Sequence, residues 1–273
     1  ETAKNLNKDG ARILGIHLEG PFINPMHKGA QNEKFIIEPT KSVLDQLTSS
    51  GIIKLITIAP EIPGAIEAIR LLRENGIYVS LGHSDATYED TVKAIMAGAS
   101  QVTHLFNGMR PFHHREPGII GAGLAEEALR CQIIADGIHL HFSSIRLVYK
   151  AKGYNNVILI SDSMSATGLS DGDYELGGLN VTVKSGAPRL PDGRLAGSTL
   201  TLGVAVKNMV TRGLIPLPFV SEMASDVPAK SIGETATGSF SYGKKADIVI
   251  LDKFLRVVRT YIDGRAVYES ESL

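Results

Sequence analysis

Short apolar segments alternate with amphipathic segments over the first 160 positions, and this alternation limits the possible folds more than any other feature of the chain. The apolar segments predict six strands, at 12–18, 52–59, 77–81, 101–104, 131–135 and 157–161. Amphipathic stretches at 40–49, 64–75, 88–97 and 143–152 predict helices between them. Strands that alternate with helical crossovers indicate a parallel sheet. Because a closed (β/α)8 barrel has eight strands, we expect a TIM-type barrel whose first two strands lie upstream of residue 1.

The pattern changes after Gly168. A Gly-rich stretch at 173–195 predicts a hairpin excursion, and helical stretches at 198–209 and 218–224 follow it. The segments 247–251, 256–261 and 265–268 read as strands, with an Ile-Asp-Gly turn before the last one. We therefore expect an N-terminally incomplete barrel at residues 1–240, and the C-terminal strands of a small β-sandwich domain at residues 241–273.

Composition excludes several classes of protein. A net charge of −1 gives no electrostatic reason to expect a nucleic-acid or membrane partner. Cys131 is the only cysteine, so no intrachain disulfide can form, which fits a reducing compartment. No apolar run approaches the roughly 20 residues that span a bilayer. We expect a cytoplasmic protein.

Four polar side chains follow predicted strands: Glu19, His83, His104 and Asp162. Active-site groups of β/α barrels lie at this end of the strands. A carboxylate with two imidazoles suits one Zn per active site, and is compatible with Fe or Mn. Taken singly, a histidine here is more often a hydrogen-bonded core residue, and the glutamate could cap a loop. Their coincidence at strand ends favours a metal site.

Asp162 is then the candidate general base, although a turn-capping aspartate is a common alternative. His139 could donate a hydrogen bond to a developing oxyanion, oriented by the nearby Asp136, or it could merely pack. The loop that holds Asn107, Gly108 and Arg115 suits a phosphate group, although surface arginines without a ligand are commoner. The remaining histidines are assigned to strand, loop or surface roles: His17, His27, His113, His114 and His141.

Six motifs in order closely resemble those of N-acetylglucosamine-6-phosphate deacetylases of the amidohydrolase superfamily. They are His17–Phe22, Gly82–Ser84, Thr103–Met109, Arg115–Gly118, Ala135–His139 and Leu195–Leu200. The resemblance implies a metal held by Glu19, His83 and His104, with Asp162 as acid and base. It implies hydrolysis of the substrate's acetamide to glucosamine 6-phosphate and acetate.

The resemblance also implies substrate contacts and a homodimer, across which Arg115 reaches the phosphate. The implied contact residues are Ala30, Asn107, Gly108, Arg115, His139, Leu195, Ala196, Gly197 and Ser198. Gln31 stands where family members often have a histidine, and it can still hydrogen-bond the substrate. The galactosamine epimer remains an alternative substrate, and a non-catalytic sugar-phosphate binder is the alternative function.

Overall fold

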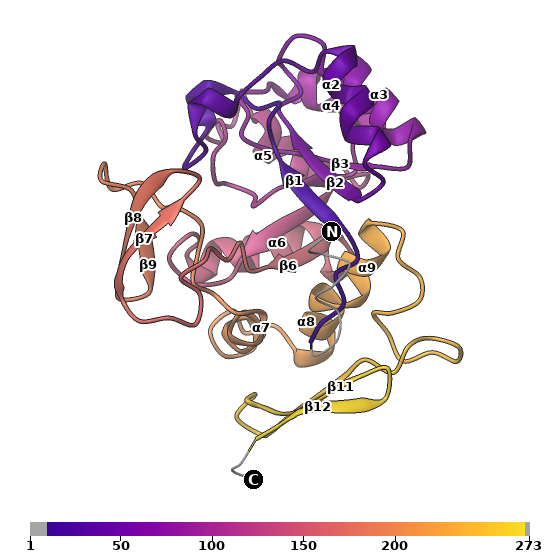
Figure 1. Cartoon of the computed structure of the whole chain (residues 1–273), viewed down its shortest axis with the longest axis vertical. Coiled ribbons are helices and arrows are strands. Elements are labelled where there is room, and N and C mark those ends of the chain that lie inside the picture. Colours follow the sequence, from indigo (N-terminus) through magenta and orange to yellow (C-terminus); the bar gives the residue numbers. More distant parts are fainter. Residues whose placement is uncertain (1–9, 271–273) are drawn as a thin grey trace.

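A parallel six-stranded sheet forms the centre of the protein, whose computed structural model describes residues 10–270 (Figure 1). The strands follow one another in the order of the sequence, and each pairs in parallel with the next. Their bounds are β1 Ile16–Glu19, β2 Ile53–Ile58, β3 Tyr78–Leu81, β4 Gln101–Val102, β5 Arg130–Ile134 and β6 Val157–Ile160. Six parallel strands with helical crossovers make a partial TIM-type barrel, as the sequence predicts.

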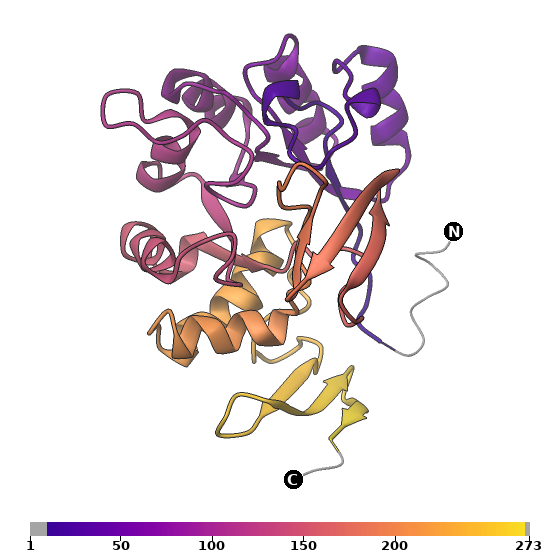
Figure 2. The ribbon, with the colours of Figure 1, turned by 90° about the vertical axis from the view of Figure 1, so that its left-hand side faces the viewer.

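Helices alternate with these strands and cover the outside of the sheet (Figures 1 and 2). They are α2 Lys41–Ser49, α3 Ala65–Glu74, α4 Tyr88–Ala97, α5 Gly118–Ala125 and α6 Phe142–Lys152. Local sequence sets their ends: Thr87 and Asp90 form a capping box at the start of α4, and Gly98 ends it in the left-handed conformation. Ile69, Leu72 and Ile145 lie fully buried in the core that the helices share with the strands.

Three helices follow β6: α7 Leu202–Thr211, α8 Leu217–Ala224 and α9 Asp226–Ser231. The predicted helix at 198–209 therefore begins later, because Ser198 and Thr199 bond across to neighbouring loops and Thr201 caps the helix. Two helices have no counterpart among the predictions. Helix α5 is glycine-rich and apolar on all sides, so it lacks an amphipathic pattern, and α9 has only six residues. Residues 1–9 of the predicted barrel domain lie outside the described residues.

Two small antiparallel sheets are attached to the barrel (Figure 2). The first contains β7 Gly172–Leu176, β8 Leu179–Lys184 and β9 Ala187–Arg189, so the predicted hairpin has a third strand. The second, near the C-terminus, contains β10 Ile248–Leu251, β11 Val257–Ile262 and β12 Arg265–Glu269, in agreement with a partial β-sandwich. Arg12 connects the N-terminal stretch to this sheet through ion pairs with Asp263 and Asp247. The boundary at residue 240 stays a prediction.

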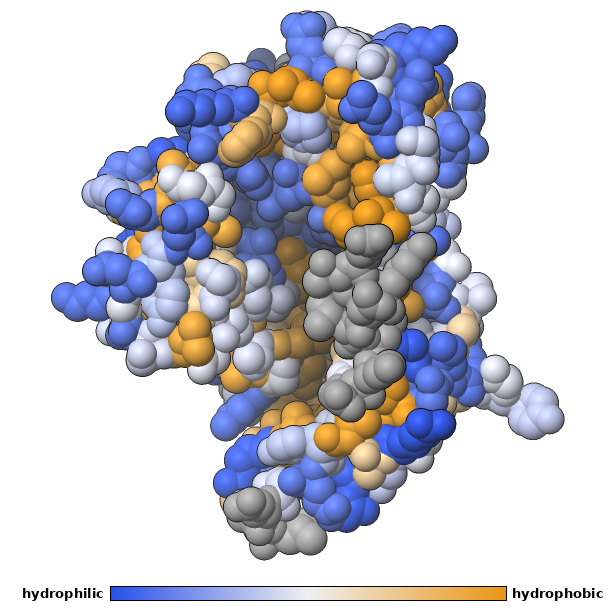
Figure 3. Space-filling model, in the orientation of Figure 1, coloured by the Kyte–Doolittle hydropathy of each residue, from blue (hydrophilic) through white to orange (hydrophobic). Residues whose placement is uncertain are grey.

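The outer strands β1 and β6 each have one pairing partner within the described part of the chain. A cavity of about 520 Å³ opens between them, lined by residues of both strands and by Glu19 and Asp162. Figure 3 shows this face of the molecule hollowed beside β1. No helix among residues 10–270 is long and apolar enough to cross a membrane.

Candidate metal and catalytic site

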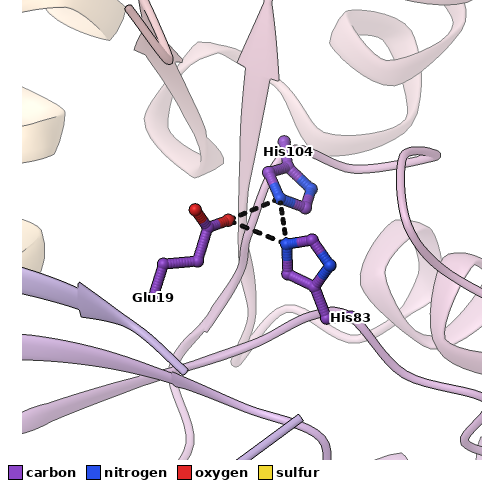
Figure 4. A group of neighbouring side chains, drawn as sticks. All are labelled: Glu19, His83 and His104. Atoms are coloured by element: carbon purple, nitrogen blue, oxygen red, sulfur yellow. Dashed lines mark hydrogen bonds and ion pairs between the residues drawn. The ribbon is translucent and has the colours of Figure 1, made fainter. Parts of the chain in front are cut away.

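Glu19, His83 and His104 meet at the carboxyl end of the sheet (Figure 4). Glu19 is the last residue of β1, His83 follows β3 and His104 follows β4. Their ligand atoms lie within 4.8 Å of one another, and among residues 10–270 this is the one group of three or more such side chains that could hold a metal ion. The parallel strands therefore bring together three residues that span 85 positions of sequence.

The nitrogens and the oxygen of this group point at one another (Figure 4). Glu19 Oε1 lies 2.7 Å from His104 Nε2 and 3.0 Å from His83 Nε2, and the two nitrogens are 3.1 Å apart. His83 Nδ1 lies 2.8 Å from the carbonyl oxygen of His27. Because a carbonyl only accepts, this Nδ1 carries a proton, which leaves Nε2 as the nitrogen of His83 that would bind a metal ion.

This donor set fits a metal ion. One carboxylate oxygen and two imidazole nitrogens are a common set of protein ligands for a catalytic zinc, which keeps a further position open. A tetrahedral zinc with bonds of about 2.0–2.1 Å separates its ligand atoms by about 3.3–3.4 Å. The observed separations of 2.7–3.1 Å are slightly shorter, so small outward shifts of the side chains are enough to admit the ion.

Electrostatics at Glu19 also favour a cation. Burial alone would raise the Glu19 pKa, but hydrogen bonds with His104 and His83 hold this pKa well below its usual value. Burial opposes protonation of His104, whereas its contact with Glu19 raises the His104 pKa. Gln31 donates a hydrogen bond of 3.3 Å to the other oxygen, Oε2, of Glu19. The carboxylate therefore remains ionised, with the two histidines at Oε1 and Gln31 at Oε2.

Three residues at this rim have strained backbones. His83, His104 and Asp162 have positive φ angles of 48°, 30° and 51°. Non-glycine residues in this region cost about 1–3 kcal/mol each and are concentrated at functional sites. Sequence patterns carry no signal for this strain, which the strand-to-loop turns impose.

Asp162 lies two residues after β6, on the far side of the cavity from β1. Burial raises the Asp162 pKa; the positive charge of His104 opposes this rise and the negative charge of Glu19 adds to it. His139 and His83 influence the same carboxyl group, so Asp162 shares the electrostatic environment of the predicted metal ligands. The backbone N–H of Ser198 donates to the Asp162 carbonyl at 2.7 Å, which brings the predicted Leu195–Ser198 contact segment alongside.

His139 is held by Asp136, whose Oδ2 lies 2.7 Å from His139 Nδ1. The other oxygen of Asp136 accepts the backbone N–H groups of Ile138 and His139. Burial opposes ionisation of Asp136, but these hydrogen bonds lower its pKa overall. Because the carboxylate accepts from Nδ1, His139 Nε2 is the nitrogen left for another partner.

The other predicted contact residues differ in their placement. Gly108 packs against the His83 ring, and Asn107 donates its side-chain amide to the carbonyls of His104 and Leu105. Ala30 packs beside the small β7–β9 sheet. Arg115 is exposed and bonds its neighbour His114, so the structure does not bring its guanidinium to the metal ligands.

Further polar residues near the candidate metal ligands form contacts that sequence patterns do not reveal. His17, expected only to share the strand of Glu19, contacts Thr57 at 2.8 Å, and Thr57 contacts Thr103, which bonds Ser80. His27, expected in a loop or surface role, does lie in the 3-10 turn η1 Pro25–His27, but its carbonyl contacts His83. These contacts join positions distant in sequence, so only the fold shows them.

Comparisons with known proteins agree with this geometry. The Amidohydrolase family model matches residues 3–267. N-acetylglucosamine-6-phosphate deacetylases of Lysinibacillus sphaericus and Bacillus subtilis are each 42% identical and match 94% and 96% of this chain. An N-acetylgalactosamine-6-phosphate deacetylase of Escherichia coli O157:H7 is 41% identical over 94% of the chain and 68% of that relative. The chain spans 67% of the length of the first two relatives.

Comparison with solved structures identifies the same family. The N-acetylglucosamine-6-phosphate deacetylase of Thermotoga maritima superposes with a TM-score of 0.90 at 42% identity, covering 94% of this chain and 70% of that one. A mutant of the Mycobacterium smegmatis enzyme, in complex with N-acetyl-D-glucosamine-6-phosphate, superposes with a TM-score of 0.90 at 35% identity, covering 93% and 68%. The chain therefore belongs to the amidohydrolase family, and within it to the N-acetylglucosamine-6-phosphate deacetylases.

Proposed function

We propose that this enzyme hydrolyses the acetamide of N-acetyl-D-glucosamine 6-phosphate, giving D-glucosamine 6-phosphate and acetate. The observation that carries the proposal is the convergence of Glu19 Oε1 with the two Nε2 atoms of His83 and His104. Asp162 lines the same cavity as Glu19. A metal site that can activate water, next to a carboxyl group that can transfer protons, suits hydrolysis of an amide. The relatives and the substrate complex described above supply the identity of the sugar phosphate.

In this proposal Glu19, His83 and His104 hold one zinc ion, with iron or manganese as alternatives. When bound, such an ion lowers the pKa of water and polarises the substrate carbonyl. Asp162 accepts a proton from the attacking water and later transfers it to the departing nitrogen. The new C–O bond gives acetate, the C–N bond breaks, and the amine leaves with the transferred proton.

His139 is proposed to stabilise the carbonyl oxygen as it gains negative charge. Asp136 accepts from Nδ1, so Nε2 is the nitrogen available to the substrate, and an N–H there would donate to this oxygen. The Leu195–Ser198 segment beside Asp162, together with Ala30, Gln31, Asn107 and Gly108, is proposed to contact the sugar phosphate. Gln31 bonds Glu19 in this structure, so its amide can position the metal ligand as well.

Arg115 is proposed to bind the phosphate across a homodimer. Arg115 is exposed and its guanidinium contacts the neighbouring His114. This position leaves it accessible to a phosphate group bound in the other subunit. Light scattering would give the mass of the protein in solution, and a monomer at working concentrations would contradict this part of the proposal. A cytoplasmic location stays a prediction.

The test is an acetate-release assay on the purified, zinc-loaded protein with N-acetyl-D-glucosamine 6-phosphate. We expect turnover that a chelator abolishes and zinc restores. The galactosamine epimer is assayed in parallel, and a higher kcat/KM for it would reassign the substrate. Sugar-phosphate binding without acetate release from either epimer would favour the non-catalytic binder instead.

A further inference from the structure

The orientation of His83 depends on a carbonyl group from outside the sheet. His83 Nδ1 donates to the carbonyl oxygen of His27 at 2.8 Å, and His27 is the last residue of η1. A three-residue turn does not have the lateral hydrogen bonds that fix a strand in a sheet. The start of the turn is fixed, because Asn24 N–H donates to the His83 carbonyl at 2.9 Å and His27 N–H donates to the Asn24 carbonyl at 3.0 Å. The His27 carbonyl lies at the other end of the turn, where a further contact can fix its direction.

Asp85 provides that connection. Its Oδ1 lies 3.0 Å from His27 Nε2, so the ring of the same residue whose carbonyl orients His83 is bound to a carboxylate. Arg110 binds Asp85 with two contacts, Nε to Oδ1 at 3.1 Å and Nη2 to Oδ2 at 2.8 Å. Bidentate pairs of this kind fix the direction of a carboxylate as well as its position.

The backbones that carry Asp85 and Arg110 are themselves fixed. Ser84 N–H donates to the carbonyl of Gly108 at 3.1 Å, and Arg110 N–H donates to the carbonyl of Ser84 at 3.0 Å. Glu61 accepts the N–H of Asp85 at 2.6 Å. The loops after β3 and β4 therefore form one bonded unit. Glu61 connects it to the start of η1 through the Asn24 side-chain amide at 2.9 Å, and Asp85 connects it to the His27 ring at the end of η1.

We propose that Asp85 is a positioning residue for metal binding: through His27 it fixes the carbonyl that keeps His83 Nε2 directed at the metal. The inference rests on the proposed metal site. The simpler alternative is an ordinary surface ion pair, because the side chains of Asp85 and Arg110 are 34% and 29% exposed. Such a pair would influence stability only slightly and would not influence metal affinity.

The experiment compares Asp85→Asn with Asp252→Asn. Asp252 forms a similar carboxylate–arginine pair with Arg256, at 2.7 Å, in the turn between β10 and β11. Zinc affinity is measured by competition with a chromophoric chelator. Loss of an outer partner of a metal ligand typically costs about 10–100-fold in affinity. Because Asp85 acts through His27, we expect Asp85→Asn to raise the zinc Kd about 10-fold, at the lower end of this range, and Asp252→Asn to leave it unchanged.

Two further measurements keep the inference separate from the proposed function. In the metal-free protein, long-range ¹⁵N–¹H NMR on labelled histidines should show His83 protonated at Nδ1 in the wild type and in a mixture of tautomers in Asp85→Asn. This NMR measurement needs no metal. If the wild-type protein did not bind zinc, the proposed metal site would be wrong, but the NMR result would still test the role of Asp85. At saturating zinc, kcat should recover with an unchanged KM.

His27→Leu provides the second variant should Asp85→Asn fail to fold. It removes the ring contact and keeps the carbonyl, so it should reproduce the weaker zinc binding, and the effects of the two substitutions should not add. His27→Gln, which retains an N–H donor, should recover part of the affinity. Folded Asp85→Asn or His27→Leu protein with wild-type zinc affinity and an unmixed His83 tautomer would overturn the inference.

Discussion

Gly108→Ala should weaken metal binding by more than its effect on stability explains. Gly108 has φ +57°, and a Cβ built there would lie 2.9 Å from His83 Nδ1 and 3.2 Å from the carbonyl oxygen of His27. These are the two atoms of the hydrogen bond that orients His83. The ring is buried and Gly29 also packs against it, which limits how far it can move. The added methyl must therefore displace the ring, the carbonyl or both.

Gly51→Ala is the matched control. Gly51 has φ +65°, and a methyl added there would meet no atom within 4 Å, so this variant carries the backbone penalty without the collision. A left-handed conformation costs an L-residue roughly 1–2 kcal/mol. Gly51→Ala should lose about this much free energy of unfolding in urea titrations, and Gly108→Ala, which adds the collision, should lose at least as much. Gly108→Ala alone should also raise the zinc Kd about 10-fold or more, as for disturbed outer partners of metal ligands. Equal zinc affinities in the two variants would refute the reasoning.

The remaining predictions concern catalysis, phosphate binding and pH. Asp162→Asn should retain zinc and substrate binding and lower kcat by about 10²–10⁴-fold, the usual contribution of a general base; near-normal turnover would place the base elsewhere. Arg115→Ala should raise KM for the phosphorylated substrate and leave the kinetics of unphosphorylated N-acetylglucosamine unchanged, and an equal loss on both would exclude a phosphate role. Burial lowers the pKa of His17 to about 4 from 6.5. Between these values the unfolded chain binds a proton that the folded protein does not, so stability falls as pH decreases through this window. His17→Gln should reduce the pH dependence of Tm in the metal-free protein, whereas an unchanged slope would contradict this assignment.

The order of strands and helices could be predicted because each barrel unit is a local pattern. Apolar runs such as 157–161 end on polar residues, and the parallel sheet brings those ends together. Helix α5 escaped prediction because it is buried on several sides and therefore lacks an amphipathic stripe.

The cluster of Glu19, His83 and His104 that could hold a metal ion was predictable from their places at strand ends, but the contacts around it were not. Asp85 reads as an ordinary loop residue, and its role depends on Arg110 and His27, 25 and 58 positions away. Gln31 is expected to contact substrate, and the structure adds a contact with Glu19. Contacts between loops depend on the relative positions of neighbouring strands, which no single stretch of sequence specifies.

The positive φ angles of His83, His104 and Asp162 lower the stability of the fold at the candidate active site. Glycine or asparagine adopts this backbone conformation more readily than histidine does, so either would relieve local strain at positions 83 and 104. Directed evolution for heat resistance alone should therefore accumulate such replacements and yield sturdier proteins that no longer turn over substrate. Each round of such a selection must therefore also test the variants for activity.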